Sequence, residues 1–353
     1  MNSGEIAAVI PDGHFIMDLI FHICDPRRDN ISRQAVKAFL AEARLTLEAD
    51  CEVVVMAKSQ GRLVGCGAIA GNVIKCIAVD PTLQGSGLSL KLLTELVTLA
   101  FERGHSELFL FTKPENVALF SGAGFWPIAQ AEGHAVLMEN SRERLARYCR
   151  QLSLYRQPGK KIGAIVMNAN PFTLGHLWLV AQAAAQCDWL HLLIVKEDAS
   201  FFSYADRWQM IERGIAGIDN VTLHPGSAWL ISRATFPGYF LKDRGVVDDC
   251  HSQIDLQLFR ERFAPALGIT HRFVGTEPFC PLTRAYNQRM KTLLSPAIEV
   301  VELPRLEQLG GAISASRVRK LYAERNWSAI AQLVPPTTLD FLTRLAAKSP
   351  QTA

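Results

Sequence analysis

The fold of the C-terminal half of this chain is decided by one stretch, "KIGAIVMNANPFTLGH", which runs from Lys161 to His176. It opens with a short apolar run typical of a buried strand and continues, after a turn, into a longer amphipathic segment typical of a helix. In open sheets of parallel strands, ligands bind beyond the carboxyl ends of the strands. We therefore expect a ligand site at the turn "NANPFTLGH", residues 168–176.

The segments that follow repeat this alternation of strand and helix. Strands separated by helices of about ten or more residues favour βαβ units and a parallel sheet. The segments are, in order, "KIGAIVMN", "GHLWLVAQAAAQC", "WLHLLIV", "SYADRWQMIERGIAG", "VTLHP", "HRFVG", "LTRAYNQRMKTLL", "IEVVELP" and "SASRVRKLYAER". The pattern predicts an α/β fold with a Rossmann-like parallel sheet.

Three residues of the turn favour a phosphate ligand. Pro171 stiffens the backbone, Gly175 permits a close approach of helix and ligand, and His176 at the helix start can donate to a phosphate oxygen. Taken alone, a histidine near a helix start is more often a surface or core residue. The neighbours of His176 decide between these interpretations.

Two signatures resemble those of the nucleotidylyltransferase superfamily. Thr173, Gly175 and His176 match its T/H-x-G-H motif, with Thr173 in place of the commoner histidine. A short Ile-Ser stretch ending in arginine at a late helix start is similar to "ISASRVR", Ile313 to Arg319. From the residues alone, the second stretch is equally consistent with a plain amphipathic helix capped by serine.

The resemblance implies a site for ATP. Thr173, His176 and Arg319, helped by Lys196, would stabilise the five-coordinate phosphorus and the departing diphosphate. The residues implied to contact ATP are Asn168, Asn170, Pro171, Phe172, Gly175, Arg207, Ser314 and Ser316. Two assignments stay open from the residues alone, because Lys196 is equally a solvated lysine at a strand end and Arg207 is equally a partner in a surface ion pair.

The N-terminal half predicts a mixed α and β domain. Residues 51–80 cluster β-branched side chains around the turn "SQGR", which favours antiparallel strands. Residues 87–104 have a helical period, with leucines on one face. Between these segments lie Gly85 and Gly87, whose bare backbone at a helix start favours a phosphate site, although glycines there are often simple turn residues.

The same region resembles the GNAT acetyltransferases. In "AVDPTLQGSGLSLKLL", Gln84 and Gly87 match the acyl-CoA-binding motif of that family, while Ser89 departs from its final small position. The segment "LFLFTKPENVALFSGAGF" is similar to the second half of the fold. The resemblance implies that Gln84, Gly85 and Gly87 bind a pantetheine or CoA-like group, and it carries over no acid or base residue.

The predicted domain boundaries follow from one linker. A helical segment ending in "LSLYR" is followed by "QPGKK", Gln157 to Lys161, where a Pro-Gly pair precedes the new strand. We expect a GNAT-like domain at 1–140, a linker helix and loop at 141–160, and a nucleotidylyltransferase-like domain at 161–353.

The whole chain resembles the citrate (pro-3S)-lyase ligases, because both domains and three of their motif segments occur in the same order. That family uses ATP and acetate to acetylate the prosthetic-group thiol on the acyl carrier subunit of citrate lyase, through acetyl adenylate, and releases AMP and diphosphate. Mg²⁺ is the expected counterion of ATP, and no acidic cluster in the sequence identifies protein ligands for it. Two alternatives stay open: a nucleotidylyltransferase acting on a phosphorylated metabolite such as phosphopantetheine, or a nucleotide-regulated GNAT acetyltransferase.

Composition sets the remaining expectations. The chain has 353 residues, of which 49% are hydrophobic and 20% charged, as in ordinary globular proteins. A net charge of +3 gives no reason to expect a nucleic-acid or membrane partner. The first residues lack a basic leader with a clean apolar core, and the eight cysteines form no C-x-x-C pair, so we expect reduced thiols and a cytoplasmic location.

Overall fold

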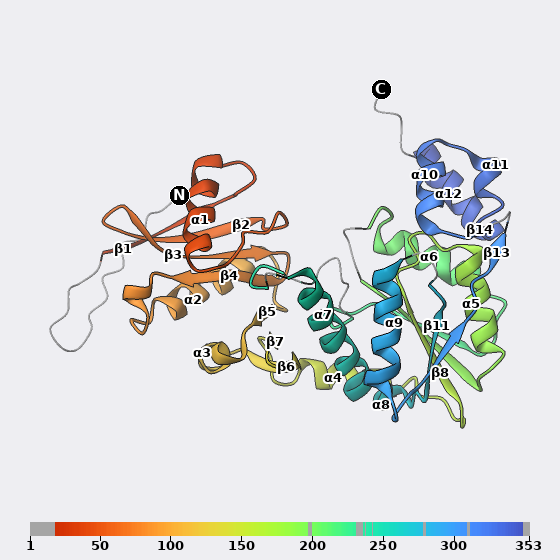
Figure 1. Ribbon diagram of the computed structural model, residues 1–353. Helices are drawn as coiled ribbons and strands as arrows, with labels where there is room; N and C mark the ends of the chain where they lie inside the picture. Colours follow the sequence, from red (N-terminus) through yellow and green to blue (C-terminus); the bar gives the residue numbers. More distant parts are fainter. Residues whose placement is uncertain are drawn as a thin grey trace. The chain divides into compact units, whose positions relative to one another are not determined.

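The computed structural model describes residues 18–196, 200–230, 236, 238–241, 243–277, 280–308 and 311–348. These residues form two compact units, of which the first contains 18–144 together with 238–250, and the second contains the rest (Figure 1). The boundaries predicted at 1–140, 141–160 and 161–353 stay a prediction. The predicted boundaries place residues 238–250 in the second domain, whereas the structure places these residues in the first unit.

The first unit is built on a seven-stranded sheet in the order β1-β2-β3-β4-β5-β7-β6. Its strands are β1 (Leu19–Cys24), β2 (Val53–Ser59), β3 (Arg62–Ala70), β4 (Val73–Val79), β5 (Phe109–Thr112), β6 (Trp126–Ala131) and β7 (Ala135–Glu139). Its helices before residue 144 are α1 (Asn30–Glu42), α2 (Leu88–Glu102) and α3 (Val117–Gly122), with 3₁₀ turns at Pro81–Leu83 and Pro114–Asn116. The neighbouring strands are antiparallel except for β4 and β5, which are parallel.

Helix α2 packs against β3 because two glycines of that strand leave room for it. A Cβ atom added at Gly67 would lie 2.5 Å from the Cδ1 of Leu96, and one added at Gly65 would lie 2.8 Å from the Cδ1 of Leu92. Both leucines are buried on the apolar face that the sequence predicts. This close packing fixes the N-terminus of α2 beside the carboxyl end of β4.

The second unit contains a five-stranded sheet in the order β10-β9-β8-β11-β12, and all of its pairings are parallel. Its strands are β8 (Ile162–Met167), β9 (Trp189–Ile194), β10 (Val221–His224), β11 (His271–Gly275) and β12 (Glu299–Leu303), with a separate pair β13 (Glu307–Gln308) and β14 (Gly311–Ala312). The helices from residue 144 onward are α4 (Arg144–Ser153), α5 (Leu174–Ala184), α6 (Tyr204–Gly214), α7 (Arg244–Leu258), α8 (Ala264–Leu267), α9 (Pro281–Leu294), α10 (Ala315–Ala323), α11 (Trp327–Ile330) and α12 (Pro336–Lys348), with a π-helical turn at Phe259–Phe263. The predicted fold class, a mixed α and β first half followed by a Rossmann-like parallel sheet, is confirmed.

The strand order reverses between β8 and β11, and this reversal positions the site. The chain leaves β8 into α5 and leaves β11 into α9, and these two helices lie on opposite sides of the sheet (Figure 1). In open parallel sheets, a crevice forms where consecutive connections go to opposite faces. The carboxyl ends of β8 and β11 therefore border the expected ligand crevice.

Two further properties concern the whole described chain. Among the described residues, no helix combines the length and the apolar character needed to cross a membrane. All eight cysteines lie in the described part and carry free thiols, of which Cys51, Cys66, Cys76 and Cys250 are buried.

A buried histidine pair joins two strands of the second sheet. Nδ1 of His191 on β9 lies 2.9 Å from Nε2 of His224 on β10, and both side chains are almost fully buried. Burial lowers the pKa of His191 to about 4, and burial together with His191 lowers the pKa of His224 to about 3. An unfolded histidine has a pKa of about 6.5, so both rings fold in the neutral form.

We expect the free energy of unfolding to fall as the pH drops from about 6.5 toward 4, because the unfolded chain then binds protons that the folded pair does not. Replacing His224 by Gln keeps a side chain that can donate and accept, and it removes one titrating group. The variant should therefore show a shallower loss of stability on acidification, measured by denaturant unfolding at several pH values. His134→Gln, at an exposed position, is the control. Equal pH slopes for His224→Gln and the unchanged protein would contradict this explanation.

Candidate functional site

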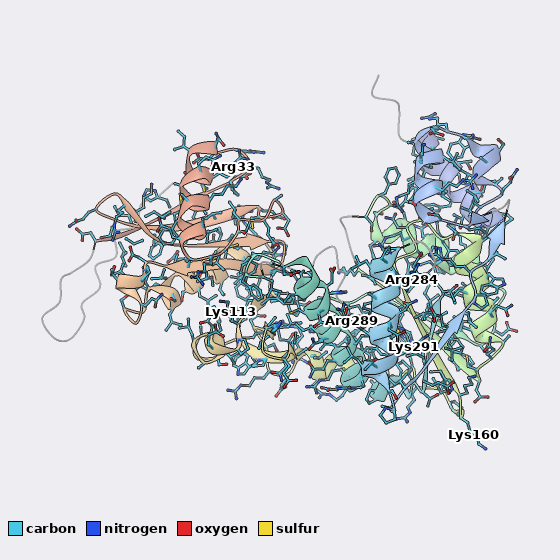
Figure 2. The ribbon with its side chains drawn as sticks, viewed as in Figure 1. Arg33, Lys113, Lys160, Arg284, Arg289 and Lys291 are labelled. Carbon is cyan, nitrogen blue, oxygen red and sulfur yellow. The ribbon has the colours of Figure 1, made fainter. Side chains whose placement is uncertain are left out.

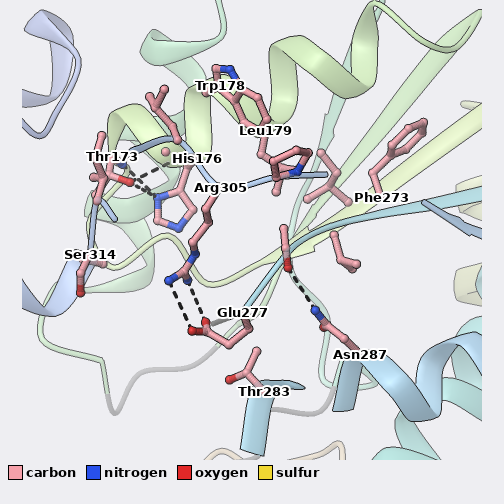
Figure 3. Close-up of a pocket in the computed structure, with 18 of the residues that line it drawn as sticks. Thr173, His176, Trp178, Leu179, Phe273, Glu277, Thr283, Asn287, Arg305 and Ser314 are labelled. Atoms are coloured by element: carbon pink, nitrogen blue, oxygen red, sulfur yellow. Dashed lines mark hydrogen bonds and ion pairs between the residues drawn. The ribbon is translucent and has the colours of Figure 1, made fainter. Parts of the chain in front are cut away.

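A cavity of about 510 Å³ lies at the reversal of strand order in the second unit. Its walls come from Ile165 and Val166 of β8 and from the end of β11 at Gly275. The first residues of α5, α9 and α10 complete the lining (Figure 3). Helix N-termini carry unpaired N–H groups and a partial positive charge, so their convergence favours an anionic ligand.

Thr173 and His176 form a reciprocal cap at the start of α5. The backbone N–H of Thr173 donates to Nδ1 of His176 at 3.0 Å, and the backbone N–H of His176 donates to Oγ1 of Thr173 at 3.4 Å. A backbone N–H can only donate, so Nδ1 is the acceptor and the neutral ring carries its proton on Nε2. Figure 3 shows this second nitrogen directed into the cavity.

The imidazole of His176 is held in its neutral form. Burial, and next the nearby guanidinium of Arg305, lower its pKa to about 4. Phe172, fully buried, stacks on the ring with centroids 5.8 Å apart and planes inclined by 17°. At neutral pH, His176 therefore offers the cavity one oriented hydrogen-bond donor and no charge.

The stretch "ISASRVR" supplies the opposite wall through its first serines and its last arginine. Arg319 lines the cavity and donates from Nη1 to the carbonyl of Asn170 at 2.6 Å. Ser314 and Ser316 also line it, and their hydroxyls lie 2.6 Å apart. Ser314 stands at the N-cap position of α10 but makes no side-chain bond to a backbone amide, contrary to the predicted capping role. Arg317 is exposed and is not among the lining residues.

An ion pair that the sequence reasoning missed crosses the cavity. Nη2 of Arg305 lies 2.9 Å from Oε2 of Glu277, whose other oxygen accepts the backbone N–H of Cys280 at 3.1 Å. Figure 3 shows both side chains beside His176. Glu277 follows β11 by two residues and Arg305 follows β12 by two residues. Charged residues just beyond parallel strands were a signal that could have identified them.

Helix α9 supports this side of the cavity. Asn287 lines the cavity and donates from Nδ2 to the carbonyl of Gly275 at 3.0 Å. Arg284 and Lys291 project from the same helix (Figure 2), and Arg284 donates from Nε to the carbonyl of Glu277 at 3.1 Å. These bonds tie the end of β11 and the loop after it to α9.

Several residues predicted to contact ATP make hydrogen bonds that support the turn, and their contact with ATP stays a prediction. Arg207 is fully buried and donates from Nη1 to the carbonyl and side-chain oxygens of Asn168, at 2.9 and 2.6 Å, and to the carbonyl of Val195 at 3.0 Å. The side chain of Asn170 accepts the backbone N–H of Phe202 at 3.1 Å. This placement favours a supporting role for Arg207 over direct contact with the nucleotide.

The predicted residues thus divide into two groups. Those that line the cavity are Thr173, Gly175, His176, Ser314, Ser316 and Arg319. Those that do not line it are Asn168, Asn170, Pro171, Phe172, Lys196 and Arg207. Lys196 is exposed just beyond β9, so its predicted role stays a prediction.

The described lining of the cavity offers few ligands for Mg²⁺. In the described ranges, no group of three or more His, Cys, Asp or Glu side chains could hold a metal ion. Glu277 is the sole carboxylate among the described lining residues, and it is already paired with Arg305. Mg²⁺ commonly binds through substrate phosphates and one or two carboxylates.

A second cavity, of about 500 Å³, lies within the first unit between β4 and β5. Gln84, Gly85 and Ser89 line it, whereas Gly87 occupies the N-cap position of α2. Gly85 and Gly87 have φ angles of +83° and +81°, which a residue with a side chain rarely adopts. The predicted glycine loop is thus required for the backbone path around this cavity.

Replacing Arg305 by Met should raise the pKa of His176 above its value of about 4. The change removes a nearby positive charge and leaves the Glu277 carboxylate without its partner, and both effects favour the imidazolium form. Imidazole NMR signals followed through a pH titration measure the shift. Arg317→Met, at the exposed position, is the control and should leave the titration unchanged. An unchanged His176 titration in Arg305→Met would show that the two groups do not interact.

Comparisons with known proteins agree with this architecture. The family described as "Citrate lyase ligase C-terminal domain" matches residues 162–342, and the "Acetyltransferase (GNAT) family" matches residues 18–125. The citrate (pro-3S)-lyase ligase of Klebsiella pneumoniae is 73% identical over 342 residues, which cover 96% of this chain and 100% of that protein. Its counterpart in Escherichia coli (strain K12) is 50% identical over 333 residues, covering 93% and 95% of the two chains.

A shorter similarity concerns a different activity. A stretch of 117 residues, 32% of this chain, is 26% identical to 68% of the phosphopantetheine adenylyltransferase of Corynebacterium glutamicum (strain R). The full-length matches are far more extensive. By its C-terminal family match and its near-complete coverage of two close relatives, the chain belongs to the citrate (pro-3S)-lyase ligase family.

Proposed function

We propose that this chain acetylates the prosthetic-group thiol on the acyl carrier subunit of citrate lyase, and thereby activates that enzyme. ATP and acetate are the co-substrates, and AMP and diphosphate are the products. The observation that carries the proposal is the arrangement of His176, Arg319 and the N-termini of α5 and α10 around one cavity. Nucleotidyl transfer depends chiefly on positioning and on donors aimed at phosphate oxygens, which this arrangement supplies.

The first step forms acetyl adenylate. An oxygen of acetate attacks the α-phosphorus of ATP. The bond between this phosphorus and the oxygen that bridges the α- and β-phosphates breaks, and diphosphate leaves with the electron pair. Negative charge grows on the phosphate oxygens during this exchange. The Nε2–H of His176 can donate to such an oxygen without first taking a proton, because Nδ1 is the acceptor from Thr173. The guanidinium of Arg319 offers a planar fork for two phosphate oxygens.

The N-terminus of α5 adds a backbone donor. The amide of Leu174 is used by the carbonyl of Leu333 at 2.9 Å, and the amide of His176 is used by Thr173. The amide of Gly175 lies between them on the cavity wall. A Cβ atom added here would lie 3.6 Å from Oγ1 of Thr173 and 3.7 Å from Cβ of Ile313, so glycine leaves more room for a phosphate to approach this amide.

The second step transfers the acetyl group. The carrier thiol, as thiolate, attacks the acetyl carbon of acetyl adenylate, the carbon–oxygen bond to phosphate breaks, and AMP leaves. The thiol proton is released to the solvent or to phosphate. Overall, ATP, acetate and the thiol give AMP, diphosphate and the acetyl thioester. We propose that Mg²⁺ arrives on the triphosphate as part of the substrate, since Glu277, the carboxylate among the described lining residues, is already paired with Arg305.

The first unit is proposed to receive the pantetheine-type arm of the carrier. Gln84 and Gly85 line its cavity, and Gly87 precedes the N-terminus of α2, a helix long enough to carry a partial positive charge at that end. These features suit a phosphate at one end of the cavity. Asn168 and Arg207 are proposed to act on the nucleotide indirectly, by holding the turn, and Lys196, exposed just beyond β9, is proposed to help neutralise the phosphates. We propose a cytoplasmic location, where the free thiols of the chain stay reduced.

A second candidate is adenylylation of a phosphorylated metabolite such as phosphopantetheine, and the short match to a phosphopantetheine adenylyltransferase favours it. The two reactions differ in the fate of the adenylyl group. The ligase requires acetate and releases AMP, whereas the second reaction keeps the adenylyl group in a dinucleotide product. A third possibility, an acetyltransferase regulated by ATP, would acetylate protein from acetyl-CoA without consuming ATP.

The test incubates the chain with ATP, Mg²⁺, acetate and deacetylated citrate lyase, and follows AMP, diphosphate and recovered lyase activity. We expect all three to rise only when acetate is present. Replacing His176 by Ala should lower diphosphate release by about 10² to 10³, because a donor to transition-state charge is lost. ATP affinity, measured by calorimetry, should change much less.

His176→Gln serves as the matched variant, because its amide can still donate a hydrogen bond and should restore part of the rate. Circular dichroism checks that both variants are folded. Near-normal diphosphate release by folded His176→Ala would rule out the assigned catalytic role. A dinucleotide product in place of AMP would instead support the second candidate.

Arg319→Lys should raise the apparent KM for ATP and reduce acetyl adenylate formation, although the charge is kept. Lysine lacks the planar fork that holds two oxygens together, and it cannot reproduce the bond geometry that Arg319 makes to Asn170. Arg317→Lys, two residues away on the exposed side of α10, should have little effect. Acetate-dependent diphosphate release compares the two. A larger defect at Arg317 than at Arg319 would overturn the assignment.

A further inference from the structure

The cavity of the first unit reaches the strand separation, the point where β4 and β5 stop pairing. These strands pair only at Val73 with Phe109 and at Ile74 with Leu110, within the described residues. Beyond this point β4 contains a bulge, seen as a register shift against β3, and Cys76 within it has a φ angle of +55°. A bulge re-aims the backbone groups of a strand. The cavity extends from this point of separation to the loop at Gln84 and Gly85.

A tyrosine from the second half of the sequence lies at the strand separation. Tyr239 donates from its hydroxyl to the carbonyl of Phe111 on β5 at 2.6 Å. The same phenol accepts a hydrogen bond from the backbone amide of Cys76 on β4. One hydroxyl therefore bridges the two strands at the point where their own pairing stops. Tyr239 and its neighbour Phe240 both line the cavity, and each is only 8% exposed.

The segment that carries Tyr239 is anchored at its backbone as well. The carbonyl of Tyr239 accepts the N–H of Thr46 at 3.0 Å, and the N–H of Gly238 donates to Oε1 of Glu48 at 2.8 Å. The second oxygen of Glu48 is 2.9 Å from Nζ of the buried Lys75. These bonds make the segment a fixed wall of the cavity.

The buried lysine explains why this wall is rigid. Lys75 is 2% exposed, and its Nζ also lies 2.6 Å from Asp50. Burial alone would lower the pKa of Lys75, but Glu48 and Asp50 raise it overall, so the group stays charged. A buried charge that loses a partner is strongly destabilising. Glu48 is therefore constrained to remain where it holds Gly238.

At the strand separation, two backbone groups that could bind an acyl carbonyl or its neighbours are already used. The Cys76 amide and the Phe111 carbonyl are the strand groups at the separation, and Tyr239 already uses both. A thioester carbonyl placed there would lose hydrogen bonds to water and would meet a Cys76 amide that already donates to Tyr239. A thiol makes only weak hydrogen bonds, so it loses less when it is placed beside groups that are already paired.

We propose that the first-unit cavity binds the free-thiol form of a pantetheine-type arm and that Tyr239, with Phe240, excludes the acetylated form. This inference rests on the proposed function, in which the free thiol is the substrate and the thioester is the product. Selection of the thiol by Tyr239 would let the acetylated arm leave the first unit after transfer.

The experiment measures binding of dephospho-coenzyme A and of its acetyl thioester to the full chain by calorimetry. A non-hydrolysable ATP analogue saturates the nucleotide cavity, so that the adenosine of the probe does not bind there. We expect the thiol to bind at least about tenfold more tightly than the thioester, a ratio typical of a pocket that rejects one extra small group. Tyr239→Ala should bring the two affinities to within about threefold of each other, chiefly by improving binding of the thioester.

Two further variants make the result specific. Tyr239→Phe keeps the ring but frees the Cys76 amide and the Phe111 carbonyl, so it should lose part of the discrimination, and it tests the proposal should Tyr239→Ala fail to fold. Phe101→Ala removes an exposed aromatic ring from α2 of the same unit and should keep the full ratio. Equal affinities in the unchanged protein, no binding of either probe, or an unaltered ratio in both Tyr239 variants would each overturn the proposal. Acetate-dependent AMP release, measured in parallel, reports separately on the proposed function.

Discussion

The reversal of strand order between β8 and β11 is the constraint on which the nucleotide site depends. Because the chain leaves these neighbouring strands toward opposite faces of the sheet, the edge between their carboxyl ends stays uncovered. Gly163 allows this close pairing, since a Cβ atom there would lie 2.7 Å from the ring of Phe273. The N-termini of α5 and α10 then face the same crevice. A positive potential arises from the backbone itself, and few additional cations are needed.

The arginine side chains around that crevice are held in place by a carbonyl and a carboxylate of the protein. Arg319 is bonded to the carbonyl of Asn170, and Arg305 is paired with Glu277. Burial and Arg305 keep His176 neutral, and Thr173 fixes its orientation. Groups that are ordered in advance lose less conformational freedom when a ligand binds, and they stabilise developing charge without reorganising. The same network therefore explains both the rigidity of the site and its suitability for phosphate chemistry.

The sequence predicted the parts of this molecule that depend on local pattern. The alternation of strands and helices after residue 160 is found in the structure, and the motif containing Thr173 and His176 lies on the cavity wall. The role of Arg207 was harder to predict. The sequence pattern puts this residue on a helix near the site, but it does not show that the guanidinium donates a hydrogen bond to Asn168. Glu277 and Arg305 lie 28 residues apart and form no recognisable motif. Their pairing depends on which strand ends become neighbours in the sheet.

The least predictable feature is the return of residues 238–250 to the first unit. Tyr239 and Phe111 are 128 residues apart, and Gly238 and Glu48 are 190 residues apart, so no local signal connects them. A chain ended at residue 140 would leave the Cys76 amide, the Phe111 carbonyl and one oxygen of Glu48 without the partners seen here. Each hydrogen bond lost in this way contributes about 0.5 to 1.5 kcal/mol, which matters against the marginal stability of a domain. The GNAT-like fold in this family member is therefore completed by a segment encoded within the nucleotide-binding half, and the two halves of the sequence are structurally interdependent even though each has its own sheet.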